Sequence, residues 1–183
     1  MNSGSKVLQD FFDGLVSQTF ASTIGLRDGD LTSYISAMLA GFCQAEELYK
    51  IRTAAGRPLS DVGEMLLESD PVFGAAPSFD REREVRKHIG DYTLFFAGMF
   101  PESINHYRLR RQRLESLIDF IKAGKESYYI VSKFDVFEYA ISAPVFAKLA
   151  VRFEDCVCGL NMVKNELDVM QHPIANQTRE LLM

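Results

Sequence analysis

Helical periodicity is the feature of this sequence that most constrains its fold. Apolar side chains recur at alternating steps of three and four residues in several segments, which places them on one face of an α-helix. The most regular of these stripes runs from Phe146 to Leu167, and another runs from Leu31 to Tyr49. Only Tyr128–Ser132 resembles a β-strand, and the helical phase accounts for it equally well. The sequence therefore predicts an all-α protein.

The stripes also predict where the helices lie. They are expected over 6–20, 31–49, 61–68, 85–99, 107–133 and 146–167. Asp30 is a suitable N-cap for the helix over 31–49, and Ser78 or Asp80 could cap the helix that carries the 85–99 stripe. Pro101 should end that helix because it lacks a backbone N–H. Gly124 allows two interpretations of 107–133. The apolar phase continues across it and favours one helix, whereas a turn at Ala123–Gly124 would give two.

Five or six amphipathic helices predict a bundle, with mostly antiparallel neighbours where the loops are short. A length of 183 residues fits a single domain over 1–183. The chain is 47% hydrophobic and 25% charged, close to the average for a globular protein, so a core is expected without disulfide support. Residues 1–5 and 172–183 are expected to be loosely ordered, because no stripe extends into them.

Several classes of protein are disfavoured. No run approaches the 18 or more apolar residues of a membrane-spanning helix, and the first residues lack the apolar stretch of a signal peptide. The net charge of −5 argues against nucleic acid as a partner. Cys43, Cys156 and Cys158 are odd in number and lack zinc-site spacing, which favours reduced thiols. We therefore expect a soluble, cytoplasmic protein.

One segment resembles a known family. Residues 88–102, HIGDYTLFFAGMFPE, carry the pattern G-D-x-x-L-F-x-x-G-x-F-P-E. Together with 120–134, FIKAGKESYYIVSKF, this is similar to an uncharacterised family of bacterial all-helical proteins. In that family the second segment resembles Y-x-x-x-G-x-x-x-Y, and this sequence departs from it because Phe120 stands where a tyrosine is expected. The resemblance covers about a third of the chain and implies bacterial origin and a helical fold, but no activity.

Two glutamate–histidine pairs are candidate metal ligands. Glu84 and His88 are four residues apart, as are Glu102 and His106, so each pair would share a helix face. Imidazole and carboxylate together suit iron, zinc or manganese. The Glu-x-x-His spacing of di-iron bundles is absent, however, and Pro101 separates the pairs. The simpler interpretation makes Glu84 and His88 an exposed ion pair.

Asp91 is the second candidate. It lies among apolar neighbours and would need a partner if buried, such as His106, Tyr107 or an arginine within 108–113. The two interpretations are a hydrogen bond that fixes helix register and an acid that contacts a ligand.

Small residues form the third candidate. Gly90, Ala97 and Gly98 lie along one helix side, and Gly124 could face the same seam. They permit either close helix packing or a slot for a flat ligand. The candidate cofactor-binding residues are thus Asp91, Gly98 and Gly124.

No catalytic motif emerges, and no catalytic residue is assigned. If Phe95 and Phe100 cannot both point inward, an apolar surface remains for a dimer partner or a lipid-like ligand. The sequence favours a non-enzymatic interaction or regulatory module that self-associates, as a homodimer without a cofactor. The alternative is a bundle that binds a metal, haem or a small apolar ligand. An enzyme that uses His88, Asp91 or His106 ranks last.

Overall fold

The computed structural model describes residues 3–72, 74–107, 117–170 and 173–182. Within these ranges the regular elements are ten α-helices and one short 3₁₀ helix, with no strand, so the predicted all-α class is confirmed. The helices are α1 (Ser3–Thr23), α2 (Gly29–Phe42), α3 (Ala45–Leu48), α4 (Val62–Ser69), α5 (Phe79–Met99), α6 (Pro101–Tyr107), α7 (Leu117–Ser132), η1 (Phe137–Tyr139), α8 (Ala143–Val151), α9 (Phe153–Val169) and α10 (Pro173–Leu182).

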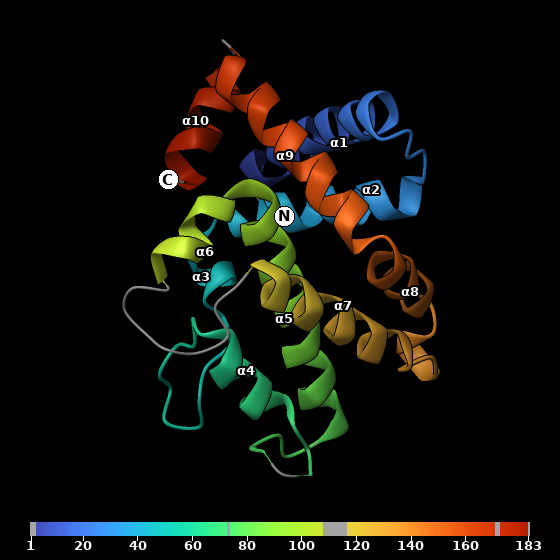
Figure 1. The fold of residues 1–183 in the computed structure, drawn as a ribbon, viewed down its shortest axis with the longest axis vertical. Coiled ribbons are helices and arrows are strands. Elements are labelled where there is room, and N and C mark those ends of the chain that lie inside the picture. The colour runs from blue at the N-terminus through green and yellow to red at the C-terminus, as the bar shows by residue number, and fades with distance from the viewer. Residues whose placement is uncertain (1–2, 73, 108–116, 171–172, 183) are drawn as a thin grey trace.

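Helix α5 is the centre of the arrangement. It packs against α7, α9 and α4, and α7 in turn packs against α8. Figure 1 shows α5 running through the middle of the molecule, with α1 and α2 beside α9 at one end and α4 at the other. Helix α10 lies against α9. Elements from both ends of the chain therefore meet around one end of α5.

Two predicted helices are each divided in the structure, which is one reason the described residues hold ten helices rather than five or six. The segment 31–49 becomes α2 and α3, separated at Cys43–Gln44. The segment 146–167 spans α8 and α9, separated at Arg152 with φ −107° and ψ 25°. The bend at Arg152 keeps the apolar face in phase, so every residue of the second stripe remains buried, whereas Ala45 of the first stripe is exposed beyond the break at Cys43–Gln44. Periodicity alone does not register such a bend.

The helix ends follow the expected local chemistry, with one correction. Ser78 caps α5 by accepting a hydrogen bond from the Arg81 N–H, and α5 ends before Pro101. The cap of α2 is Asp28 rather than Asp30, because Asp28 has the extended backbone that lets its side chain accept from the Leu31 N–H.

Helix α7 passes through Gly124 without a turn, so the helix continues across that position. Residues 108–116 lie outside the described residues, and the question of one helix or two over 107–133 is open there. Residues 173–182, for which loose order is predicted, form α10. Ala175 and Thr178 are fully buried in this helix and anchor it.

The core has two parts. The larger cluster joins α1, α2, α5, α7, α8 and α9 around Phe20, Phe95, Tyr128, Phe146 and Phe153. The smaller one packs α4 and the preceding loop against α5. Among the described helices, none combines the length and apolar character needed to cross a membrane.

Candidate functional site

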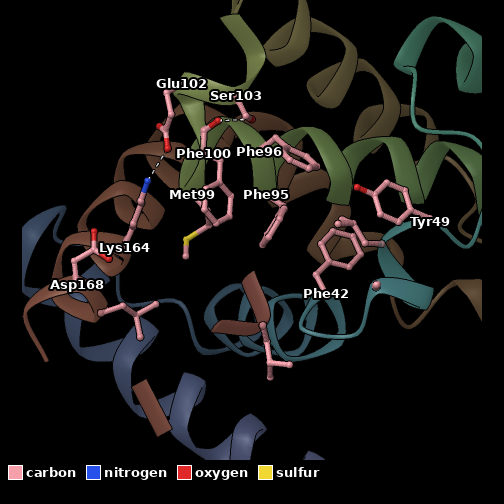
Figure 2. A pocket seen from close by; sticks show the side chains of 14 residues that line it. Phe42, Tyr49, Phe95, Phe96, Met99, Phe100, Glu102, Ser103, Lys164 and Asp168 are labelled. Atoms are coloured by element: carbon pink, nitrogen blue, oxygen red, sulfur yellow. Dashed lines mark hydrogen bonds and ion pairs between the residues drawn. The ribbon is translucent and has the colours of Figure 1, made fainter. Parts of the chain in front are cut away.

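A cavity of about 710 Å³ opens where α2, α3, α5, α6, α9 and α10 meet. We call it the aromatic cavity, because five aromatic side chains line it: Phe42, Tyr49, Phe95, Phe96 and Phe100. Figure 2 shows these rings facing a common space. Aliphatic side chains complete the apolar lining, among them Leu48, Met99, Leu167 and Leu181.

The end of α5 creates the aromatic wall. Because Pro101 cannot continue the helix, Phe100 takes φ −140° and ψ 55°, and the chain starts α6 in a new direction. Phe95 is 2% exposed and stands at the centre of edge-on contacts. Its ring centroid lies 5.2 Å from Phe42, 5.3 Å from Phe96 and 5.6 Å from Phe100. Phe95 therefore points inward, whereas Phe96 and Phe100 remain partly accessible to the cavity.

Polar groups gather at one end of the aromatic cavity. Figure 2 shows Glu102, Lys164 and Asp168 on one side and Phe42 and Tyr49 on the other. The Lys164 ammonium donates to the Glu102 carboxylate at 2.9 Å. The cavity is thus amphipathic along its length.

The same lysine also contacts the aromatic wall. The Lys164 ammonium lies 4.9 Å from the centroid of the Phe100 ring. The Ser103 hydroxyl donates its proton to the Phe100 carbonyl oxygen at 2.7 Å, at the turn between α5 and α6.

Asp91 is the acceptor of a buried polar network. Its side chain is 3% exposed. It accepts hydrogen bonds from the Tyr34 hydroxyl at 2.5 Å, the Tyr128 hydroxyl at 2.8 Å and the Lys87 ammonium at 2.7 Å. The sequence correctly predicts that Asp91 needs a partner but names other candidates for it. Of those, the side chains of His106 and Tyr107 and the whole of 108–113 lie outside the described residues.

The charges of this network follow from its geometry. Burial opposes ionisation of Asp91, but the Lys87 ammonium and the three hydrogen bonds outweigh it and hold the pKa of Asp91 below its usual value. Burial and the adjacent carboxylate raise the pKa of Tyr34 and Tyr128 well above the ordinary value. The network is therefore a carboxylate with satisfied donors that joins α2, α5 and α7.

A smaller cavity of about 170 Å³ lies next to the network. Asp91, Lys87, Lys50 and Tyr34 contribute to its lining. Phe42 lines both cavities and so forms part of the wall between them.

His88 is fully buried, which corrects the interpretation of Glu84 and His88 as an exposed pair. Its ring lies 5.9 Å from Phe42 and 6.0 Å from Tyr92 between ring centroids. The face it shares with Tyr92, four residues on, turns inward, whereas Glu84 binds Arg81 at the surface.

Burial decides the charge of His88. It lowers the pKa of the imidazole to about 4, and the nearby ammonium groups of Lys50 and Lys87 act in the same direction, against the attraction of Asp91. Neither ring nitrogen makes a well-formed hydrogen bond, although the Leu48 backbone lies near enough to favour the charged ring slightly. The ring is therefore neutral at pH 7.

Among the described side chains, Glu84, His88 and Glu102 do not come together as metal ligands. Glu84 pairs with Arg81, His88 is enclosed by aromatic rings, and Glu102 pairs with Lys164. The side chain of His106 lies outside the described residues. Within the described part of the chain, no three histidine, cysteine or carboxylate side chains converge.

The small residues serve close packing. A Cβ atom added to Gly98 would meet Leu160 of α9, and one added to Gly124 would meet Phe153 and Thr93. Gly90 likewise accommodates the Tyr128 ring. Protein side chains fill the space beside these glycines, and none of the three lines either cavity.

The cysteines are free thiols. Burial raises the pKa of Cys43 and of Cys156 to about 12, so both stay protonated near neutral pH. Cys158 is exposed. The two buried thiols thus behave as small apolar groups rather than nucleophiles.

Comparisons of the chain with protein-family models, with curated proteins and with solved structures find no match. The resemblance of 88–102 to a bacterial family therefore stays a prediction. The function has to be inferred from the site itself.

Sequence reasoning singles out Phe95 and Phe100 but not the cavity they line. Two helices that it does not predict as separate elements, α3 and α10, supply Leu48 and Leu181 to the lining. Residues 45–49 are predicted only as the end of the helix over 31–49, and no apolar stripe is predicted for 173–182.

Proposed function

We propose that this protein binds a small, predominantly apolar molecule in the aromatic cavity. The observation that carries the proposal is the cavity itself, with its volume of about 710 Å³ and its aromatic and aliphatic lining. Small-molecule sites typically measure about 300–1,000 Å³, are mainly apolar and hold a few polar groups that orient the ligand. Glu102, Lys164 and Asp168 supply such groups at one end.

The hydrophobic effect supports this proposal. The side chains of Phe96 and Phe100 line the cavity and are partly exposed. An apolar ligand would remove these rings from water, at about 25 cal/mol per Å² of apolar surface. Binding therefore has a driving force that requires no hydrogen bond.

The chemistry around the cavity favours binding over catalysis. The Ser103 hydroxyl is engaged with a backbone carbonyl, and Lys164 is paired with Glu102. His88 is buried outside the lining with a pKa of about 4.

The proposal can be tested by filling the cavity. Ala45 lines the cavity and its side chain is exposed, so Ala45→Trp should place an indole in the ligand space without disturbing the core. Phenylnaphthylamine, a neutral apolar dye, should bind the unaltered protein saturably with increased fluorescence. Its affinity should fall at least about tenfold in Ala45→Trp, because the indole occupies ligand volume.

The matched control is Ala54→Trp, at an exposed position that does not line the cavity. Each variant adds one tryptophan to a chain that has none. Unchanged affinity in Ala54→Trp is expected. Equal dye binding by Ala45→Trp and the unaltered protein would refute the cavity as the site.

Self-association is the second candidate function, and a different surface favours it. Val136, Phe137 and Ile141 lie within one short segment, and the last two are 87% and 91% exposed. Phe137 also has a positive φ of 51°, a conformation that bulky residues seldom adopt and that occurs more often at functional surfaces. A second copy of the chain would cover these side chains.

The test of self-association is the mass in solution. Analytical ultracentrifugation should show a dimer for the unaltered protein and a lower mass for Phe137→Ser with Ile141→Ser. Val169→Ser, at a 74% exposed residue of α9, is the control and should leave the mass unchanged. The same mass for all three proteins would rule out this surface.

The cellular setting is part of the proposal. The three free cysteines favour a reducing compartment such as the cytoplasm, where disulfides are rare. Bacterial origin is supported only by the resemblance of 88–102.

A further inference from the structure

We propose that the ligand of the aromatic cavity carries an aromatic ring system, and that the site selects it over a saturated molecule with the same carbon skeleton. This inference rests on the proposed function and deepens it, because it names the chemical class of the ligand. Two features of the cavity support it: the angles at which its rings meet and the groups that hold those rings in place.

The rings of the cavity meet at steep angles. The planes of Phe95 and Phe42 meet at 88°, and those of Phe95 and Phe96 at 86°. Phe100 is tilted by 58° against Phe95 and by 55° against Phe96. At such angles the positive edge of one ring is directed toward the negative face of another, which is a favoured geometry of aromatic pairs. The four rings therefore form a cluster to which a further ring can be added in the same way.

Phe96 and Phe100 leave part of this cluster open to a ligand. Both side chains line the cavity and are partly exposed, whereas Phe42 and Phe95 are buried. Figure 2 shows both rings beside that of Phe95. A ligand ring that packs edge to face against one of them gains about two- to twelvefold in affinity beyond the effect of buried area. A saturated ring has no such quadrupole and gains from burial alone.

The rings are also held in position by neighbouring groups. Phe96 packs against Tyr92 at 4.6 Å between ring centroids, and the Tyr92 hydroxyl donates to the Ser60 carbonyl oxygen at 3.0 Å. The buried ring of His88 lies 5.9 Å from that of Phe42. Because the rings are oriented before a ligand binds, a ligand that matches their geometry loses little affinity to the ordering of side chains.

The aliphatic part of the lining does not favour an aromatic ligand. Leu48, Leu167 and Leu181 contact any apolar molecule, and the gain grows with the apolar area that is buried. A saturated molecule has more apolar surface than an aromatic one with the same skeleton, so burial alone favours the saturated molecule. A preference for the aromatic molecule would therefore have to come from the rings.

Two alcohols with the same carbon skeleton test this inference. β-Naphthylmethanol and its fully hydrogenated form should each compete with phenylnaphthylamine for the cavity. We expect the naphthyl alcohol to bind at least about threefold more tightly, although it is the less hydrophobic of the two. Phenethyl alcohol and cyclohexylethanol form a smaller pair that should show the same preference.

Substitutions of the accessible rings locate the preference in the cavity. Phe96→Leu and Phe100→Leu each remove a ring and keep an apolar side chain in the lining. Each should lower the ratio of the two affinities by about twofold or more, because only the aromatic alcohol loses a ring pair. Phe79→Leu, at a 71% exposed position that does not line the cavity, is the control and should leave the ratio unchanged. A loosened cavity would weaken the binding of both alcohols, so the ratio separates ring contacts from altered packing.

Each outcome separates this inference from the proposed function. Equal affinity for the two members of each pair, or tighter binding of the saturated alcohol, would overturn the inference and leave the apolar cavity standing if the dye still binds. Failure of the naphthyl alcohol to displace the bound dye would overturn it as well. An aromatic preference that is unchanged in both Phe96→Leu and Phe100→Leu would place the aromatic alcohol elsewhere and also overturn it. Failure of the dye to bind the unaltered protein would remove the proposed function itself.

Discussion

His88 should make the stability of the protein depend on pH between about 6.5 and 4. In the unfolded chain a histidine titrates near pH 6.5, whereas burial lowers the pKa of the folded His88 to about 4. Between these values the unfolded state binds more protons than the folded state. The free energy of unfolding must therefore fall as the pH falls through this window, and the stability is fully retained above pH 6.5.

The size of the effect follows from the two pKa values. Each unit of difference between the two pKa values corresponds to about 1.4 kcal/mol. At pH 4 His88 is fully protonated in the unfolded state, and this should lower the free energy of unfolding by about 3 kcal/mol. At pH 5 the expected loss is about 2 kcal/mol relative to pH 8. His88 is fully buried, so solvent does not screen this term.

The variant His88→Leu isolates the contribution. At pH 8 it should be about as stable as the unaltered protein, because it removes no well-formed hydrogen bond and keeps an apolar group against Phe42 and Tyr92. At pH 5 it should be more stable by about 2 kcal/mol. Urea unfolding followed by far-ultraviolet circular dichroism, from pH 8 to pH 5, measures both.

The two proteins share all titratable groups except His88, so the difference between their unfolding free energies isolates the contribution of that residue. If the two stabilities change in parallel between pH 8 and pH 5, His88 is protonated equally in the folded and unfolded states. The account of a neutral, enclosed imidazole would then be wrong.

Three further predictions concern the frame around the site. Asp91→Asn should destabilise the protein by about 3 kcal/mol in urea unfolding at pH 7, because Lys87 and two phenols lose their shared carboxylate; a loss below about 1 kcal/mol would contradict the network. Gly124→Ala should lower the thermal midpoint, since the added methyl group meets neighbouring side chains, whereas Gly14→Ala, with nothing within 4 Å, should raise it. A higher midpoint for Gly124→Ala, or a lower one for Gly14→Ala, would contradict the packing around these glycines. A thiol reagent at neutral pH should modify Cys158 alone in the folded protein, and mass spectrometry showing modification of the two buried cysteines at the same rate would count against their burial.

Much of the helical frame is predictable, because local chemistry determines it. The stripe from Phe146 to Leu167 is buried along its length, and Ser78 and Pro101 act at the ends of α5 as their side chains predict. The bend at Arg152 is not predictable from periodicity. It joins two helices whose apolar faces stay in phase, and it contains neither glycine nor proline.

The site is harder to predict, because its residues meet only through tertiary packing. Asp91 accepts hydrogen bonds from Tyr34 and Tyr128, which lie 57 and 37 residues away in the chain. No local pattern connects such residues. Even the correct expectation that Asp91 needs a partner therefore could not identify that partner.

The burial of His88 is likewise predictable from the sequence only in part. The apolar stripe that contains Tyr92 passes beside His88, but the charged residues near His88 on α5 favour an exposed position. The orientation of α5 between α4 and α7 decides which edge of the stripe is covered, and that orientation depends on the packing of several helices.

Binding in the aromatic cavity is the central claim, and the Met99 methyl group tests it most directly. Met99 lines the cavity, whereas Met65 is fully buried in the smaller core cluster. Methyl-labelled methionine should be followed by NMR during titration with phenylnaphthylamine. The account predicts a saturable shift of the Met99 methyl signal with direct magnetisation transfer from the dye, while the Met65 signal stays in place. Dye binding that leaves Met99 unchanged would contradict it.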